Sequence, residues 1–151
     1  MDLTAGANVT NERAALRRNI TMNWHPIEVP QLGSPPEPYE YAIRSGNTLY
    51  LAGQVALNKH GAIVGKTTKE QSRKVWENIA VVLESAGSSI HDIVKVTYYL
   101  ADIRELNEEI EVRKEVFVGR PFPVVTAIQA AALGLPGLKL EIDVIAEIQH
   151  A

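Results

Sequence analysis

The chain of 151 residues contains no cysteine, which excludes disulfide bonds, thiolate chemistry and cysteine-ligated metal sites. Aromatic residues make up only 6% of it and are too dispersed to form a surface on which nucleic-acid bases could stack. No apolar run approaches the roughly 18 residues that a membrane-spanning helix needs, and no signal-peptide core is present. We therefore expect a cytoplasmic protein without a membrane partner, since a chain without cysteine fits a reducing compartment.

Positive charge is also scarce, because 15 lysine and arginine residues face 18 aspartate and glutamate residues. The formal net charge of -3 argues against a protein that grips phosphate backbones, so we expect no nucleic-acid partner. Walker loops, GxGxxG and HExxH motifs are missing as well. The histidines are scattered, at His25, His60, His91 and His150, and we predict neither a metal site nor a cofactor.

The chain does contain enough apolar material for one compact domain, since 46% of its residues are hydrophobic. Five prolines between residues 26 and 38 predict an extended, non-helical segment. Within it, Ile27 and Val29 are expected to form a short edge strand. We expect residues 1–25 to be a flexible N-terminal extension, in which Met22 offers an alternative start, and residues 26–151 to form the folded domain.

The secondary structure follows from two periodicities. Alternation of apolar and polar residues predicts strands, and apolar residues at every third or fourth position predict helices. The first helix is expected to begin at Thr67, whose spacing to Glu70 is that of a capping box, and to stop at Gly87. Strands are expected at residues 39–44, 48–52, 93–100, 124–130 and 138–148, and a second helix after Asp102.

The order of these elements predicts the architecture. The opening hairpin is antiparallel, whereas strands joined through a helix often pair in parallel. The sequence therefore predicts a single α+β domain with one mixed sheet and both helices on one face. The second helix is expected to turn Leu106, Ile110 and Phe117 inward. The uncovered sheet face is moderately apolar and is expected to meet a partner subunit.

Three segments resemble the RidA/YjgF family: residues 45–54 (SGNTLYLAGQ), residues 92–102 (DIVKVTYYLAD) and residues 123–133, which Leu140-Glu141-Ile142 follow at the family's spacing. The resemblance runs from about Gly33 to Ile148. It implies a chorismate-mutase-like fold and a homotrimer with ligand clefts between adjacent subunits. It also implies hydrolysis of reactive enamines and imines to 2-keto acids and ammonia.

The resemblance also implies two catalytic residues. Tyr39 matches a cleft tyrosine whose hydroxyl orients a ligand or water, although its pattern alone fits a buried aromatic of the strand equally well. Glu141 matches a glutamate thought to position or activate the attacking water, where a carboxylate on a strand's polar face is otherwise simply solvated. Gly53 matches the family's Ser-Gly-Gln turn, in which Ala52 takes the place of the serine. These residues would bind a small-molecule ligand.

Other positions of the predicted cleft depart from the family. Val125 occupies the place of the arginine that clamps the substrate carboxylate, and Ile110 that of an asparagine. Valine cannot neutralise a carboxylate, so a 2-imino acid would be a poor substrate unless another cation substitutes. Arg120 and Arg113 lie near enough in sequence to be candidates, although both fit ordinary exposed arginines.

Two functional hypotheses follow from this pattern. The first is an enzyme that hydrolyses the C=N bond of an imine or enamine metabolite, with Glu141 as general base. The second is a divergent family member without 2-imino-acid deaminase activity, which binds or transforms a less charged ligand. A third reading, an endoribonuclease as some members have been described, is disfavoured by the net acidity and by the lack of a basic stripe.

Overall fold

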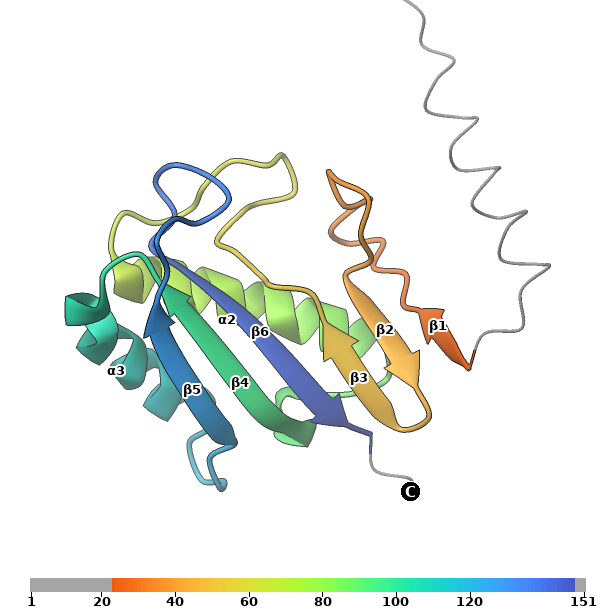
Figure 1. Cartoon of the computed structure of the whole chain (residues 1–151). Helices are drawn as coiled ribbons and strands as arrows, with labels where there is room; N and C mark the ends of the chain where they lie inside the picture. Colours follow the sequence, from red (N-terminus) through yellow and green to blue (C-terminus); the bar gives the residue numbers. More distant parts are fainter. Residues whose placement is uncertain (1–22, 149–151) are drawn as a thin grey trace, which may run out of the picture.

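The computed structural model describes residues 23–148, so most of the expected N-terminal extension, with Met22, lies outside the described residues. One mixed sheet of six strands has both long helices on the same face (Figure 1), which confirms the predicted α+β fold. Its elements are β1 (Trp24–Pro26), β2 (Ala42–Ser45), β3 (Thr48–Leu51), α2 (Thr68–Ser85), β4 (Ile93–Leu100), α3 (Leu106–Val116), β5 (Val124–Gln129) and β6 (Leu140–Glu147). No helix within residues 23–148 is long and apolar enough to cross a membrane.

The strand order across the sheet is β1-β2-β3-β6-β4-β5. Only β4 and β5, which α3 connects, pair in parallel; every other neighbouring pair within the described residues is antiparallel. The last strand of the described residues, β6, is thus inserted between β3 and β4. This insertion matters for function because it brings the start of β6 beside the end of β3.

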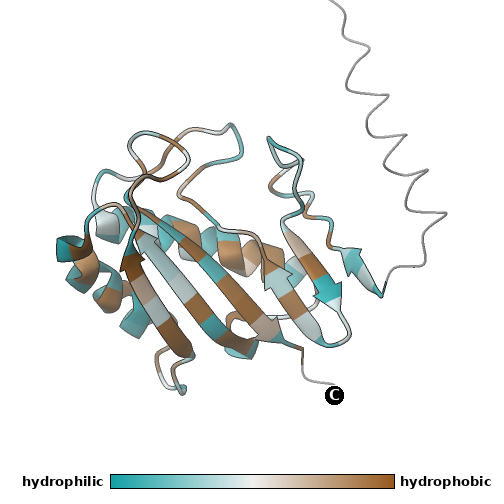
Figure 2. Cartoon of the chain, in the orientation of Figure 1, coloured by the Kyte–Doolittle hydropathy of each residue, from teal (hydrophilic) through white to brown (hydrophobic). Residues whose placement is uncertain are grey.

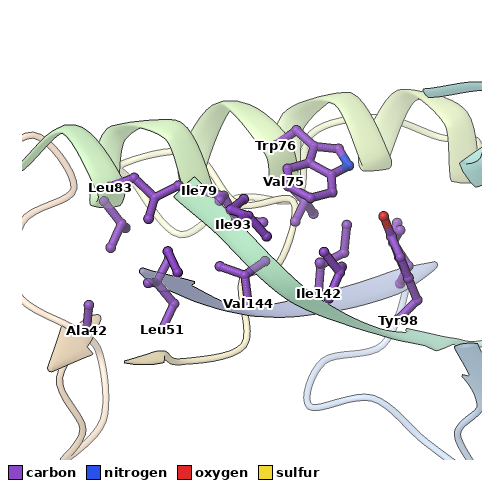
Figure 3. Close-up of a cluster of buried hydrophobic side chains, with 14 of the residues drawn as sticks. Ala42, Leu51, Val75, Trp76, Ile79, Leu83, Ile93, Tyr98, Ile142 and Val144 are labelled. Atoms are coloured by element: carbon purple, nitrogen blue, oxygen red, sulfur yellow. The ribbon is translucent and has the colours of Figure 1, made fainter. Parts of the chain in front are cut away.

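Helix α2 begins and ends where the sequence predicts. The Thr67 side chain accepts a hydrogen bond from the backbone of Glu70, and the Glu70 carboxylate accepts one from Thr67 in return. At the other end Gly87 has a φ of 72°, the left-handed conformation that favours glycine. The helix packs Val75 and Ile79 against the inner face of the sheet, where they meet apolar side chains such as Ile142 and Val144 (Figure 3).

Helix α3 differs in part from its prediction. Asp102 caps a short 3-10 turn (Ile103–Glu105), and α3 begins only after it. Phe117 is buried as expected, but Ile110 is only partly covered, and the helix buries Glu109 and Val112 instead. A polarity pattern places carboxylates outside, so it misses a glutamate that an ion pair allows to be buried.

The edge strand is also displaced from its prediction. Ile27 and Val29 lie outside β1, which ends at Pro26. The Ile27 amide still donates to the carbonyl of Ala42, at 2.9 Å, but the chain then turns, because the Leu32 amide donates to the Val29 carbonyl. Val29 consequently packs into the core instead of continuing the ladder.

Hydrophobic and hydrophilic residues alternate along the strands, as the coloured bands of Figure 2 show. Because successive side chains of a strand point to opposite sides, this alternation separates two faces of the sheet. In β6, Ile142 and Val144 are buried under the helices, whereas Glu141, Asp143 and Ile145 point to the opposite face. No helix of the described chain covers that opposite face (Figure 1). The side chain of Glu141 is therefore presented on the side of the sheet away from the core.

Candidate functional site

Three of the predicted site residues come together at one end of the sheet. Tyr39 precedes β2, Gly53 follows β3, and Glu141 is the second residue of β6. The antiparallel pairing continues past the end of β3, because the backbones of Gln54 and Ile142 exchange two hydrogen bonds of 2.8 and 3.0 Å. This bridge fixes Gly53 and Glu141 as close neighbours from distant parts of the sequence.

Gly53 is the residue against which the Glu141 carboxylate rests. A Cβ atom at position 53 would lie 1.9 Å from Oε1 of Glu141 and 2.8 Å from its Cδ. Any side chain here would displace the carboxylate, so glycine is required for the close approach and not for an unusual φ. The absence of a side chain at this position thereby sets the position of the acidic group.

Burial and a neighbouring charge tune the acidity of this group. Burial raises the pKa of the Glu141 carboxyl above its ordinary value, and the nearby carboxylate of Asp143 raises that pKa further. Burial, with Tyr41, Glu37 and Glu141 as smaller causes, likewise raises the pKa of the Tyr39 phenol. Glu141 is therefore a stronger base than an exposed glutamate, and Tyr39 remains a protonated hydrogen-bond donor at neutral pH.

A groove of about 290 Å³ opens beside this group. Its two walls are the proline-rich segment with Tyr39 and Tyr41, and the loop of residues 53–61 that follows β3. The two tyrosine rings meet edge to face, with their centroids 6.2 Å apart. A volume of this order lies at the lower end of the range for small-molecule sites and suits a small metabolite.

The loop wall of the groove is attached to helix α2. The Asn78 side chain is only 5% exposed and donates to the carbonyls of Val55 (3.1 Å) and Leu57 (3.0 Å). Sequence reasoning did not select Asn78, although an amide between the core residues Val75 and Ile79 is a signal that could have revealed a structural role. It also did not select the groove itself, since residues 53–61 have no regular period.

Ala52 lies beside Gly53 and adds no polar side chain to the site. Its backbone amide donates to the carbonyl of Tyr41, at 2.9 Å, and its carbonyl accepts from the side chain of Gln54, at 3.1 Å. The predicted loss of a hydroxyl at this position therefore leaves Tyr39 and Glu141 as the polar side chains of the group.

The remaining predicted residues lie elsewhere in the chain. Val125 is on β5, two strands away from β6, and it pairs with Val96 on the face covered by the helices. Val125 packs against the core, whereas Glu141 points to the other face. Ile110, on α3, is partly exposed, and Arg120 is exposed in the loop between α3 and β5. Within one chain, these three residues do not join the Tyr39 group.

Arg113 is already engaged. Its guanidinium forms an ion pair with the fully buried carboxylate of Glu109, one turn earlier on α3. The same guanidinium lies over the ring of Tyr98, with its central carbon 4.5 Å from the ring centroid. The expectation of an ordinary exposed arginine is wrong for Arg113, since its side chain is only 16% exposed. The pair is electrically neutral, so Arg113 is a poor replacement for a carboxylate clamp.

Comparisons with known proteins identify the family. The profile of the family described as Endoribonuclease L-PSP matches residues 32–148. A RutC family protein of Pyrococcus horikoshii is 42% identical over 110 residues, which are 72% of this chain and 86% of the relative. The human 2-iminobutanoate/2-iminopropanoate deaminase is 33% identical over 110 residues, or 72% of this chain and 79% of the human protein. A relative of Schizosaccharomyces pombe, mmf2, is named mitochondrial; it is 40% identical over 72% of this chain and 86% of its own.

A solved structure agrees with the sequence relatives. The Rid family protein YyfA of Yersinia pestis superposes with a TM-score of 0.78 at 32% identity, and the match covers 83% of this chain and 99% of that protein. Its similarity extends over the sheet and both helices, so it supports the fold as well as the family. The chain belongs to the RidA/YjgF family, whose sequence profile carries the description Endoribonuclease L-PSP.

Proposed function

We propose that this protein hydrolyses the C=N bond of a reactive imine or enamine metabolite at the group of Tyr39, Gly53 and Glu141. The observation that carries the proposal is the Glu141 carboxylate, which rests against Gly53 with a raised pKa. A human relative named as a deaminase of 2-iminobutanoate and 2-iminopropanoate supports the reaction class. The proposed partners are a small-molecule ligand and other copies of this chain, without nucleic acid or membrane, in the cytoplasm.

In the proposed reaction, Glu141 accepts a proton from water as the water oxygen attacks the imine carbon. The C=N π electrons of the imine, already protonated on nitrogen, pass to that nitrogen, and a neutral carbinolamine results. The protonated Glu141 then gives its proton to the amine nitrogen. The C–N bond breaks as the carbinolamine hydroxyl releases its proton to water, and a carbonyl compound and ammonia leave. An enamine enters the same path after protonation of its carbon, which converts it to the imine. The Tyr39 hydroxyl orients the water or the substrate by hydrogen bonding.

The proposed site is completed by a second subunit. Val125 and Ile110 belong to the β5 and α3 side of the molecule, and the sheet separates Val125 from Glu141 of the same chain. A cleft that contains both sides therefore requires two copies, as in a homotrimer with one cleft at each subunit contact. The uncovered sheet face, on which Tyr50 is 45% exposed, offers apolar surface for such contacts.

A second candidate function is binding or conversion of a less charged ligand without 2-imino-acid deaminase activity. The specific observation in its favour is the neutral Glu109–Arg113 pair, since it engages the guanidinium of Arg113, one of the two arginines that could have compensated for Val125. The two candidates differ in their response to a 2-imino acid. A carboxylate held next to Val125 would lose its hydration without gaining the bidentate charge partner that an arginine at this position would supply.

The experiment that tests the first candidate uses imines made in situ by an amino-acid or amine oxidase. Semicarbazide traps imine that has not been hydrolysed, so enzyme activity lowers the initial rate of semicarbazone formation. Wild type is expected to exceed the uncatalysed rate, and Glu141→Gln to lose about 100-fold or more of kcat. Glu84→Gln, an exposed position on α2, is the matched control and should keep full activity. A Glu141→Gln variant as active as wild type would remove Glu141 from the mechanism.

A further inference from the structure

The groove continues beyond the Tyr39 group to a turn that carries positive charge. Asn58 builds this turn, because its side-chain oxygen accepts from the amides of His60 (2.9 Å) and Ala62 (3.0 Å). Gly61 closes the turn with a φ of 76° and donates to the Asn58 carbonyl. Lys59 and His60 are exposed at its tip, and both line the groove.

The charges along the groove are segregated. Among the described residues that line it, Lys59 carries a formal positive charge and none is an aspartate or glutamate. The carboxylates of Glu37 and Glu141 lie near Tyr39 instead, where both act on its pKa. Gly53, against which the Glu141 carboxylate rests, lines the groove, so negative charge borders the groove beside Gly53 and Tyr39, whereas the positive charge of Lys59 lies at its turn. The ion pair of Glu109 with Arg113, on α3, is neutral and does not alter this separation of charge.

The wall that carries Lys59 is held in place by α2. Asn78 fixes the carbonyls of Val55 and Leu57, directly before the turn. In addition the Asn58 amide donates to the carbonyl of Ala62, at 2.9 Å, and the amide of Val64 donates to Ala56, at 2.8 Å. A turn held by these bonds presents its cation at a defined place, so less entropy is lost when it contacts a ligand.

We infer that the substrates of this site are imines or enamines whose anionic group, a carboxylate, lies several bonds away from the C=N group. This inference rests on the proposed function and adds a binding subsite for the anion at Lys59 and His60. The C=N end, which becomes cationic when protonated, is attracted by Glu141, and the carboxylate is attracted by Lys59 at the other part of the groove. His60 adds a hydrogen-bonding ring at the same turn. A carboxylate directly next to the C=N carbon would instead approach Glu141 and be repelled.

The test compares three five-carbon imines in the full-length protein. An amine oxidase generates 5-iminopentanoate, whose carboxylate is remote, from 5-aminopentanoate. The same enzyme generates pentan-1-imine, which has no carboxylate, from pentylamine. An amino-acid oxidase generates 2-iminopentanoate, whose carboxylate is adjacent to the C=N carbon, from norvaline. Wild type should show the lowest KM for 5-iminopentanoate. Lys59→Gln should raise that KM about fivefold, because an exposed charge pair contributes up to about this factor. The KM for pentan-1-imine and every kcat should stay unchanged.

Lys66→Gln is the matched control, since Lys66 is an exposed lysine of the same loop that does not line the groove. Equal KM values for the remote-carboxylate and neutral imines, or a Lys59→Gln variant with unchanged KM, would overturn the subsite while hydrolysis itself stands. Binding of pentanoate, followed by NMR shifts of the Gly53 and Gly61 amides, tests the subsite without catalysis. Saturable binding of pentanoate whose affinity falls about fivefold in Lys59→Gln supports the subsite even where no imine is hydrolysed. Equal affinity in the two proteins, or no saturable binding, refutes it.

Discussion

The contact between Gly53 and Glu141 makes Gly53→Ala the most informative substitution in this protein. A Cβ at position 53 would lie 1.9 Å from Oε1 of Glu141, whereas ordinary van der Waals contact begins at 3.4 Å. The oxygen must therefore move by about 1.5 Å, the difference of the two distances. Misplacement of a catalytic group by about 1 Å can cost about 100-fold in rate, and we expect a kcat loss of that order.

The same substitution should leave the stability nearly unchanged. Gly53 does not have a positive φ, so alanine fits its backbone, and Gly→Ala at such a site stabilises by about 0.4–1 kcal/mol through the unfolded chain. The displaced Glu141 side chain is flexible and half-buried, and a strained rotamer costs about 0.5–1.5 kcal/mol. The two effects nearly cancel, so the free energy of unfolding should change by less than about 1 kcal/mol.

The assay combines semicarbazone kinetics with urea unfolding of the same preparations. Gly87→Ala is the complementary control: its φ of 72° opposes alanine and no atom lies within 4 Å of the new Cβ, so it should lose about 1–2 kcal/mol of stability and keep full activity. Wild-type activity in Gly53→Ala would refute the claim that this glycine positions the carboxylate. A Gly53→Ala variant that unfolds much more easily would show that the loss of activity has another origin.

Four further predictions concern the charges of the site and its surroundings. The raised pKa of Glu141 predicts a kcat/KM that rises with pH through an inflection above the ordinary glutamate pKa, and Asp143→Asn should lower that inflection, as a pH profile would show. The folded state binds the proton of the Glu141 carboxyl more tightly than the unfolded state, so the free energy of unfolding should fall as pH rises from the ordinary to the raised pKa. Glu141→Gln should abolish that fall, as thermal unfolding measured between pH 4 and 8 would show. Val125→Arg should raise the hydrolysis of 2-iminopropanoate at least tenfold by supplying a bidentate cation, and unchanged kinetics would argue against the role of this position. Arg113→Ala should cost about 3–5 kcal/mol in urea unfolding because it leaves the buried Glu109 unpaired, and adding Glu109→Ala should recover part of that loss.

The elements that depend on local signals could be predicted well from the sequence. The capping box of Thr67 and Glu70 lies within four residues, and it marks the start of α2 correctly. The alternation of β6 similarly fixes which of its side chains are buried. The pairing order of the strands is not local, and only the expectation of a mixed sheet could be stated before the structure was known.

The candidate site shows the same difference between local signals, which the sequence carries, and long-range contacts, which it does not. Glu141 taken alone resembles a solvated residue of a polar strand face, and only the family register singled it out. The structure adds the physical reason, which is the approach of β6 to Gly53 across 88 residues of sequence. The burial of Glu109 could not be predicted, because it depends on Arg113 and Tyr98 arriving from the same helix and a neighbouring strand. The groove could not be predicted either, since both of its walls are irregular.

The attachment of the groove's walls has a consequence for how a ligand enters. The wall of residues 53–61 is fastened to α2 through the two hydrogen bonds of Asn78. The facing proline-rich wall is connected to Tyr41 by a longer hydrogen bond of 3.4 Å to the carbonyl of Leu32. Opening should therefore move the Leu32 wall while the Asn78 wall stays fixed, so amide hydrogen exchange should be faster at Leu32 and Gly33 than at Leu57. The proline-rich segment would then act as the moving gate, and Glu141, anchored on β6, would keep its position throughout.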